Sequence, residues 1–257
     1  MPFFIELLDT LHAADMPVPY AIRDRDGNGL RELCGKPALL QPRLSGKHIK
    51  APNAPATAPR SASCWRTFTW LPASTSSSVV PTAAWTGCWL RVPSCCRALP
   101  PSKPRCCSRR WMKSARTRHR VLALPRANLH ADLFRDNVMF EGTHLTGVID
   151  FYNACSGPML YDIAITVNDW CLDEHGAIDV PRAQALLAAY AALRPFTAAE
   201  AELWPEMLRV GCVRFWLSRL IAAESFAGMD VMIHDPSEFE VRLAQRQQVA
   251  LHLPFAL

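Results

Sequence analysis

The chain has 257 residues, 50% of them hydrophobic, and a formal net charge of +5. This length and composition predict a globular protein with one large or two modest domains. No apolar run approaches the roughly 20 residues that a bilayer-spanning helix needs, and the first residues lack the basic region and cleavage site of a signal peptide, so we expect a cytoplasmic protein with no membrane partner.

The first 50 residues predict a helix packed on a small sheet. Apolar side chains recur at helical spacing over residues 3–13, and the Pro-Val-Pro run at 17–19 ends that helix. Extended segments are predicted around residues 20–22 and 37–41, and the Asp- and Gly-rich run at 24–29 predicts a turn between them.

The charge is distributed very unevenly along the chain. Residues 33–131 contain 17 Lys and Arg but no Asp or Glu. A basic surface that binds nucleic acid usually intersperses acids, glycines and aromatic residues among its basic ones, and a basic tail is poor in Trp and Cys. Because this segment fits neither pattern, we predict no nucleic-acid partner.

Residues 54–118 do not resemble an evolved protein sequence. They hold six of the ten cysteines and show no hydrophobic period of 2 or 3.6 residues. The pairs Cys95-Cys96 and Cys106-Cys107 raise the alternatives of a metal site or disulfides. Both are disfavoured, because adjacent cysteines lack the spacer of zinc sites, no histidine sits at ligand spacing, and the cytoplasm keeps thiols reduced.

The genetic code offers another explanation for this segment. The codons for residues 63–70, read one base earlier, encode Leu-Leu-Ala followed by a pattern typical of an amphipathic helix. We therefore hypothesise that two compensating frame changes scrambled roughly residues 54–118. The alternative is an unusual natural insertion, and sequencing the coding DNA distinguishes the two.

Regular patterning returns at Val121. Residues 145–150 predict a short buried strand that ends in an acid. Asp and Pro residues predict the start of a helix over residues 179–193, and a capping box predicts the start of a long helix over residues 197–226. Most apolar positions in these elements are predicted to be core.

The polar residues at 130–137 match the spacing of a kinase catalytic loop. They read His-Ala-Asp-Leu-Phe-Arg-Asp-Asn, and a strand-end Asp follows 13 residues later. Phosphoryl transfer needs a carboxylate to accept the proton of the attacking hydroxyl, and hard oxygen ligands to hold Mg²⁺ against the phosphates of ATP. We predict Asp132 as the base and Asn137 and Asp150 as ligands of Mg²⁺ and its bound nucleotide, with His130 bracing the catalytic loop.

The flanking residues carry a family resemblance. The segments LHADLFRDNVMF and GVIDFYNACSGPMLYDIAI resemble the aminoglycoside-phosphotransferase-like superfamily. Within it the chain is similar to homoserine kinases, through IDFYNACSG, NDWC, RFWLSRL and FFIELLDTLHAADMPVPY. The resemblance covers about residues 2–52 and 119–257. It implies an α+β, protein-kinase-like two-lobe fold and ATP-dependent phosphorylation of the small-molecule substrate L-homoserine, a step of threonine biosynthesis.

The same resemblance implies further site residues. Residues 40–44 would form the interlobe hinge beside adenine, with Gln41 and Arg43 contacting the nucleotide mainly through backbone groups. Asp162 would support the catalytic loop, its alternative being a surface helix cap. Recognition of homoserine would fall to polar and aromatic groups of the C-terminal lobe, namely Tyr152, Asp169, Trp170 and Arg214, although core packing explains Trp170 at least as well.

The sequence also departs from the family pattern. The resemblance implies a phosphate-covering loop and a strand lysine ahead of the first helix, and the sequence contains neither. We therefore expect an N-terminally truncated chain with little or no activity, in which Glu6 has lost its ion-pair partner. Three segments are predicted: a remnant of the nucleotide-binding lobe at 1–48, the anomalous and poorly ordered segment at 49–118, and the C-terminal catalytic lobe at 119–257.

Two other functions remain open at this point. The chain could phosphorylate another small alcohol or amine, such as choline or an aminoglycoside, or it could be a non-catalytic relic. The sequence does not determine the oligomeric state.

Overall fold

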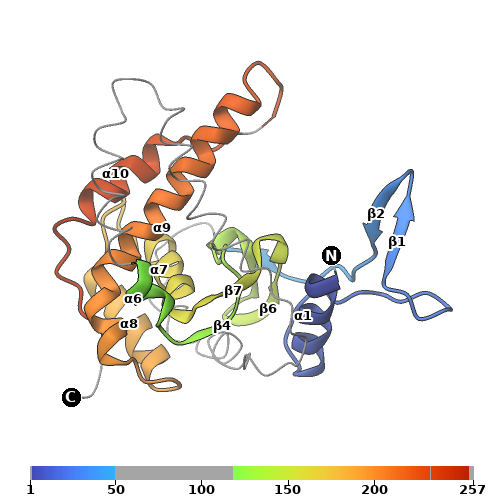
Figure 1. Cartoon of the computed structure of the whole chain (residues 1–257), viewed down its shortest axis with the longest axis horizontal. Coiled ribbons are helices and arrows are strands. Elements are labelled where there is room, and N and C mark those ends of the chain that lie inside the picture. The colour runs from blue at the N-terminus through green and yellow to red at the C-terminus, as the bar shows by residue number, and fades with distance from the viewer. Residues whose placement is uncertain (1, 50–117, 232, 255–257) are drawn as a thin grey trace.

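The computed structural model describes residues 2–49, 118–231 and 233–254 (Figure 1). The hypothesis of a frame change over residues 54–118, and the two cysteine pairs within that segment, lie outside the described residues. No described helix is both long and apolar enough to cross a membrane.

The predicted helices correspond to three of the described ones. The helix expected at 3–13 is α1, the helix expected at 179–193 is α8, and the capping box opens α9 as predicted. The described helices are α1 (Pro2–Ala13), α6 (Arg118–Leu122), α7 (Met159–Trp170), α8 (Val180–Ala191), α9 (Ala198–Ser225) and α10 (Ser237–Gln245).

The strands form three small antiparallel sheets. The described strands are β1 (Leu30–Leu33), β2 (Lys36–Leu39), β3 (Lys47–His48), β4 (Arg126–Leu129), β5 (Val138–Glu141), β6 (His144–Val148) and β7 (Cys155–Pro158). The sheets are β1-β2, β3-β5-β6 and β4-β7. The strand predicted at 145–150 is β6, and the segment predicted at 37–41 overlaps β2, whereas residues 20–22 belong to no described strand.

The N-terminal residues pack against the segment that follows residue 118. Strand β3 pairs with β5, and the backbone N–H of Val148 donates to the carbonyl of Pro17 at 2.8 Å. The ring of Phe4 in α1 stacks on Tyr152, with 5.2 Å between ring centroids. In Figure 1 α1 lies beside these strands, while the β1-β2 hairpin extends away from the rest of the described chain.

Helices α7 and α9 form the centre of the helical region. Both present side chains that are buried along most of their length, including Ile163 and Val167 of α7 and Met207 and Trp216 of α9. Figure 1 shows α8 and α10 beside this pair, on the side of the molecule away from α1. The α7–α9 pair supplies some of the site side chains described below, and α7 also supports the loop that carries others.

Candidate active site

The catalytic-loop residues connect β4 to β5. Strand β4 ends at Leu129, the loop passes through a short 3-10 turn at Arg135–Asn137, and β5 begins at Val138. Ala131 has a φ of 61°, in the left-handed region that non-glycine residues rarely adopt. Such a backbone needs support from its surroundings, and α7 supplies it.

Asp162 of α7 holds the start of this loop. Its two carboxylate oxygens accept the backbone N–H groups of His130 and Ala131, each at 2.8 Å. The side chain is buried, so the alternative of a surface helix cap is wrong. Burial raises the pKa of Asp162 to about 7, although the two N–H donors act in the opposite direction.

His130 joins the loop to the end of β6. Its Nε2 lies 2.8 Å from the carbonyl oxygen of Ile149, the residue before Asp150, and its ring packs on Phe151. Burial lowers the pKa of His130 to about 4, so the imidazole is neutral at physiological pH. Because the side chain is buried and lies outside the pocket lining, its geometry is that of a bracing residue.

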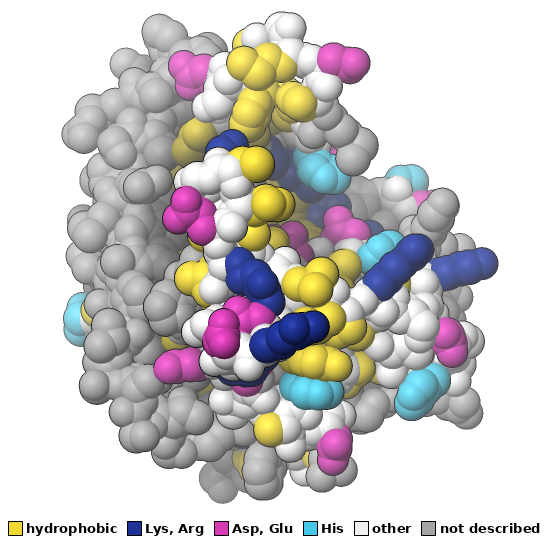
Figure 2. Space-filling view, turned by 90° about the vertical axis from the view of Figure 1, so that its right-hand side faces the viewer, with side chains coloured by type: hydrophobic (Ala, Val, Ile, Leu, Met, Phe, Trp, Pro, Cys, Tyr) yellow, Lys and Arg dark blue, Asp and Glu magenta, His cyan; other side chains and the backbone are white. Residues whose placement is uncertain are grey.

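A cavity of about 1080 Å³ opens beside the loop. Its lining includes Asp132, Asn137 and Asp150, together with residues of α9 and α10. Figure 2 shows a hollow that holds basic and acidic side chains, beneath a hydrophobic tip at the top of the view, where Figure 1 places the end of α9.

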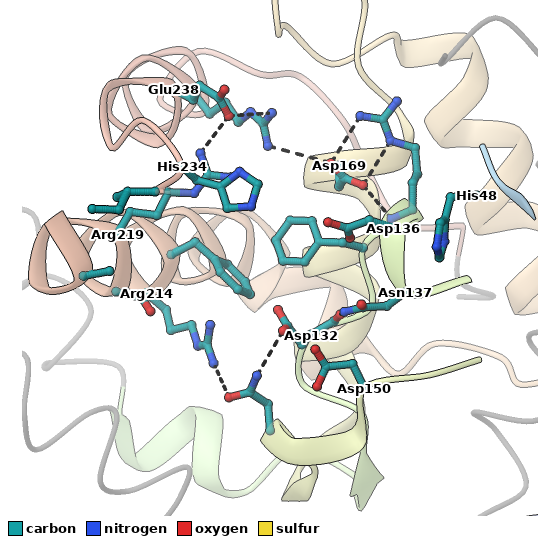
Figure 3. A pocket seen from close by; sticks show the side chains of 18 of the residues that line it. His48, Asp132, Asp136, Asn137, Asp150, Asp169, Arg214, Arg219, His234 and Glu238 are labelled. Carbon is teal, nitrogen blue, oxygen red and sulfur yellow. Dashed lines mark hydrogen bonds and ion pairs between the residues drawn. The ribbon is translucent and has the colours of Figure 1, made fainter. Parts of the chain in front are cut away.

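The three residues predicted to carry the chemistry converge on this cavity. In Figure 3 the side chains of Asp132, Asn137 and Asp150 lie close together at one side of it. The amide Nδ2 of Asn137 donates to the carbonyl oxygen of Asp132 at 2.8 Å, which leaves its Oδ1 as the atom able to bind a cation. Asp150 has a φ of 63° and is exposed to the cavity.

The side-chain oxygen atoms of Asn137 and Asp150 fit magnesium. Mg²⁺ takes oxygen ligands, needs only one or two carboxylates from the protein and keeps several waters. The described residues contain no group of three His, Cys, Asp or Glu placed to hold a metal, so an all-protein cage is not present in that part of the chain. One amide oxygen from Asn137 and one carboxylate from Asp150 match the few protein ligands that Mg²⁺ needs.

Asp132 has two further neighbours in the cavity. Its Oδ2 accepts Nδ2 of Asn153 at 3.0 Å, and Oδ1 of Asn153 accepts Nη2 of Arg214 in α9 at 2.9 Å. Burial raises the pKa of Asp132 to about 6, Arg214 lowers it, and the nearby carboxylate of Asp150 raises it. A base whose pKa lies near physiological pH suits proton transfer.

Asp169 of α7 fixes the 3-10 turn of the loop. Its carboxylate accepts the backbone N–H of Arg135 at 2.9 Å and the side-chain Nε of the same residue at 3.1 Å. Arg242 of α10 approaches it at 4.0 Å. Asp169 lines the cavity, but these contacts already occupy its carboxylate, so its geometry is that of a loop anchor.

Besides His130 and Asp162, four more predicted site residues lie outside the cavity lining. Tyr152 is 73% exposed and stacks on α1, and Trp170 donates its Nε1 to the carbonyl of Leu133 at 3.2 Å. Gln41 donates to the carbonyl of Pro19, and Arg43 is exposed. Of the four substrate candidates, the structure therefore brings only Asp169 and Arg214 to the cavity.

Sequence reasoning missed Asn153 and the charged residues of α10. Asn153 stands three residues after Asp150, inside the quoted segment IDFYNACSG, but an Asn in a loop carries no motif that separates it from an ordinary turn residue. Arg242 and Glu238 lie about 90 residues beyond the strand-end Asp, and only the tertiary structure places them beside the same cavity.

Comparisons with known proteins find relatives of this chain among phosphotransferases. Residues 1–196 match the family model described as "Phosphotransferase enzyme family". Over the whole chain the sequence is 57% identical to a homoserine kinase of Pseudomonas aeruginosa and covers 81% of that protein. It is 36% identical to a homoserine kinase of Methylobacillus flagellatus, over 86% of this chain and 68% of the relative.

Solved structures show the same fold at low sequence identity. The amicoumacin kinase hAmiN aligns with 98% of this chain and 78% of its own, at a TM-score of 0.69 and 13% identity. A choline/ethanolamine kinase family protein from Mesorhizobium loti aligns with 95% of this chain and 78% of its own, at a TM-score of 0.63 and 17% identity. The predicted α+β, kinase-like fold with a helical C-terminal region is confirmed.

Proposed function

Because the chain belongs to the phosphotransferase enzyme family and, within it, to the homoserine kinases, we propose that it transfers the terminal phosphoryl group of ATP to the hydroxyl of L-homoserine in the cytoplasm. The single observation that supports this cavity as the place of the reaction is the convergence of Asp132, Asn137 and Asp150 on its wall. The product would enter threonine biosynthesis.

Each residue of the site has a separate role in this reaction. Asp132 accepts the proton of the attacking hydroxyl, because it is the carboxylate that faces the cavity with a raised pKa. Asn137 and Asp150 would hold Mg²⁺, which when bound neutralises charge on the phosphates. Asp162 accepts the backbone N–H groups of His130 and Ala131, and so holds Ala131 in the left-handed conformation that precedes Asp132.

Arg214 is the residue that we propose for the carboxylate of homoserine. It lines the cavity from α9 and is linked to Asp132 through Asn153. Guanidinium groups suit planar recognition of carboxylates. Asp169 is less suited to the ammonium group, because Arg135 and Arg242 already surround its carboxylate. Tyr152 and Trp170 do not line the cavity, so the geometry does not support a substrate role for them.

A coupled assay of ADP release tests the proposal. We expect the turnover that the chain retains, even if it is low, to be with L-homoserine, and none above background with choline or an aminoglycoside at the same concentration. Asp132→Asn should lower kcat at least about 100-fold, the usual contribution of a general base. Asp173→Asn is the matched control, because Asp173 caps a turn after α7 outside the cavity lining and makes the same change of charge.

Nucleotide binding gives a readout that does not depend on turnover. We expect a fluorescent ATP analogue to bind in the presence of Mg²⁺ and to lose at least about tenfold in affinity in Asp150→Ala, because the cation bridges protein and phosphates. The low activity predicted for this chain stays a prediction, and the same two assays measure it. Turnover equal for homoserine and choline would contradict the substrate assignment, and binding that ignores Mg²⁺ would contradict the metal site.

A further inference from the structure

We infer that Asn153 is a positioning residue, which holds the carboxylate of Asp132 in the orientation that proton transfer needs and is itself held by Arg214. The inference rests on the proposed function, in which Asp132 is the base. It adds a residue that the motif of the catalytic loop does not contain, because Asn153 comes from the turn after β6 and lies 21 positions beyond Asp132.

The hydrogen bonds fix which way the amide of Asn153 points. Nη2 of Arg214 lies 2.9 Å from Oδ1 of Asn153, and Nδ2 of Asn153 lies 3.0 Å from Oδ2 of Asp132 (Figure 3). A guanidinium only donates and a carboxylate only accepts. The amide oxygen must therefore face Arg214 and the amide nitrogen must face Asp132, so reversing the amide would lose both bonds.

The backbone that carries Asn153 is also fixed. Asn153 ends the 3-10 turn Phe151–Asn153, for which Asp150 is the N-cap residue. Phe151 anchors this turn, since it is buried and packs on the ring of His130 with 4.5 Å between centroids. One turn thus carries Asp150, which would hold the cation, at its start and Asn153, which donates to Asp132, at its end.

This anchoring acts on a carboxylate with several charged neighbours. Asp132 is half-buried and interacts with Arg214 of α9, Asp150 after β6, Asp136 of its own loop and Asp162 of α7. Binding Oδ2 to Asn153 restricts rotation of the carboxylate and leaves Oδ1 to accept from the substrate hydroxyl. A misplacement of about 1 Å at such a group costs up to about 100-fold in rate.

Steady-state kinetics with L-homoserine and ATP tests the inference. Asn153→Ala should lower kcat about 10- to 100-fold, while KM for both substrates stays within about threefold. Asn153→Asp keeps the shape but cannot donate to Asp132 and repels it, so its loss of kcat should be at least as large. A packing role predicts instead that this isosteric variant is tolerated.

A matched control separates catalysis from folding. Asn168 is a buried amide of α7 that donates to the carbonyl of Leu208 at 2.8 Å and does not line the cavity. Asn168→Ala should lower the midpoint of unfolding but leave kcat per folded molecule unchanged. An equal loss of kcat in this control would show that the Asn153 effect is a general loss of structure, and would overturn the inference.

A double-mutant cycle shows whether Asn153 acts through Asp132. In the Asp132→Asn background, measured by its slow residual rate, Asn153→Ala should cause no further loss of kcat. The same loss in both backgrounds, or an increase of KM for homoserine with kcat intact, would overturn the inference. If Asp132→Asn itself keeps wild-type kcat, the role of Asp132 as the base fails, and this inference with it. If the wild-type protein does not phosphorylate L-homoserine, the proposed function fails. If that variant is inactive and Asn153→Ala is not impaired, only the positioning role fails.

Crystal structures give a readout without turnover. In the wild-type protein Oδ2 of Asp132 should lie within hydrogen-bonding distance of Asn153, and in Asn153→Ala the carboxylate should have rotated away from that position. An unchanged carboxylate orientation in Asn153→Ala would overturn the inference even for a chain that shows no kinase activity.

Discussion

At the scale of single residues, two buried titratable groups with opposite pKa shifts support the loop at residues 130–137. Burial lowers the pKa of His130 to about 4 and raises the pKa of Asp162 to about 7. His130 therefore stabilises the fold above its ordinary pKa of 6.5 and loses that contribution as pH falls toward about 4. Asp162 stabilises the fold below its ordinary pKa of 3.8 and loses that contribution as pH rises through about 7.

These signs predict opposite changes in the pH dependence of stability when each of the two groups is removed. Compared with the wild-type protein, His130→Gln should make the free energy of unfolding fall more steeply as pH rises from about 4 to about 6.5, by on the order of 3 kcal/mol over that range. Asp162→Asn should change the pH dependence in the other direction as pH rises from about 4 to about 7, by on the order of 4 kcal/mol. Urea unfolding of all three proteins across this range measures these changes, and changes of the same sign in the two variants would refute the assignment.

The residue scale also shows what the sequence reveals about the site. The spacing from His130 to Asn137, with Asp150 after it, predicted a catalytic loop because kinase chemistry constrains these residue types and distances. The predicted base and the two predicted oxygen ligands line one cavity in the structure. Tyr152 and Asn153 are adjacent in the sequence, yet only Asn153 lines the cavity. The direction of a side chain within a 3-10 turn depends on tertiary packing, so composition alone does not separate the two.

At the scale of elements, the anchoring of the 3-10 turn Arg135–Asn137 to α7 gives a stability prediction. Asp169→Asn removes the charge that accepts the backbone and the guanidinium of Arg135, and should cost about 2 to 4 kcal/mol, since both groups are largely buried. Glu238→Gln is the control. Its carboxylate also pairs with arginines, but it is 50% exposed and should cost less than about 1 kcal/mol. Denaturant unfolding compares the two, and equal losses would contradict the anchor.

The elements that were predicted correctly are those with strong local signals. A 3.6-residue apolar period predicted α1, and the capping box at Thr197 predicted where α9 begins. Strands β3, β4 and β7 have two to four residues each, too few for a period to be recognised, and they exist because a partner strand far along the chain pairs with them. Residues 20–22 are not part of any of the described sheets, so no described strand pairs with them.

At the scale of the whole molecule, the approach of α7 to α9 depends on one glycine. A Cβ at Gly211 would meet Nδ2 of Asn168 at 3.1 Å, and that amide is held by Leu208 on one side and by Arg246 on the other. Gly211→Ala should therefore lower the free energy of unfolding by about 1 to 3 kcal/mol, despite the better helix propensity of alanine. In the Asn168→Ala background the same change should be neutral or stabilising, and a loss in both backgrounds would refute the contact.

The pairing of β3 with β5 has a consequence for how the protein could be divided. Helix α1 and strand β3 contribute side chains and backbone bonds to the same packed unit as the catalytic loop, so neither side of the chain has all its partners when alone. Two separately expressed pieces that together hold the whole chain, residues 1–49 and residues 50–257, should accordingly be reassembled by these contacts into a split enzyme. Joining each piece to one of two interacting proteins would then turn their association into a phosphorylation signal.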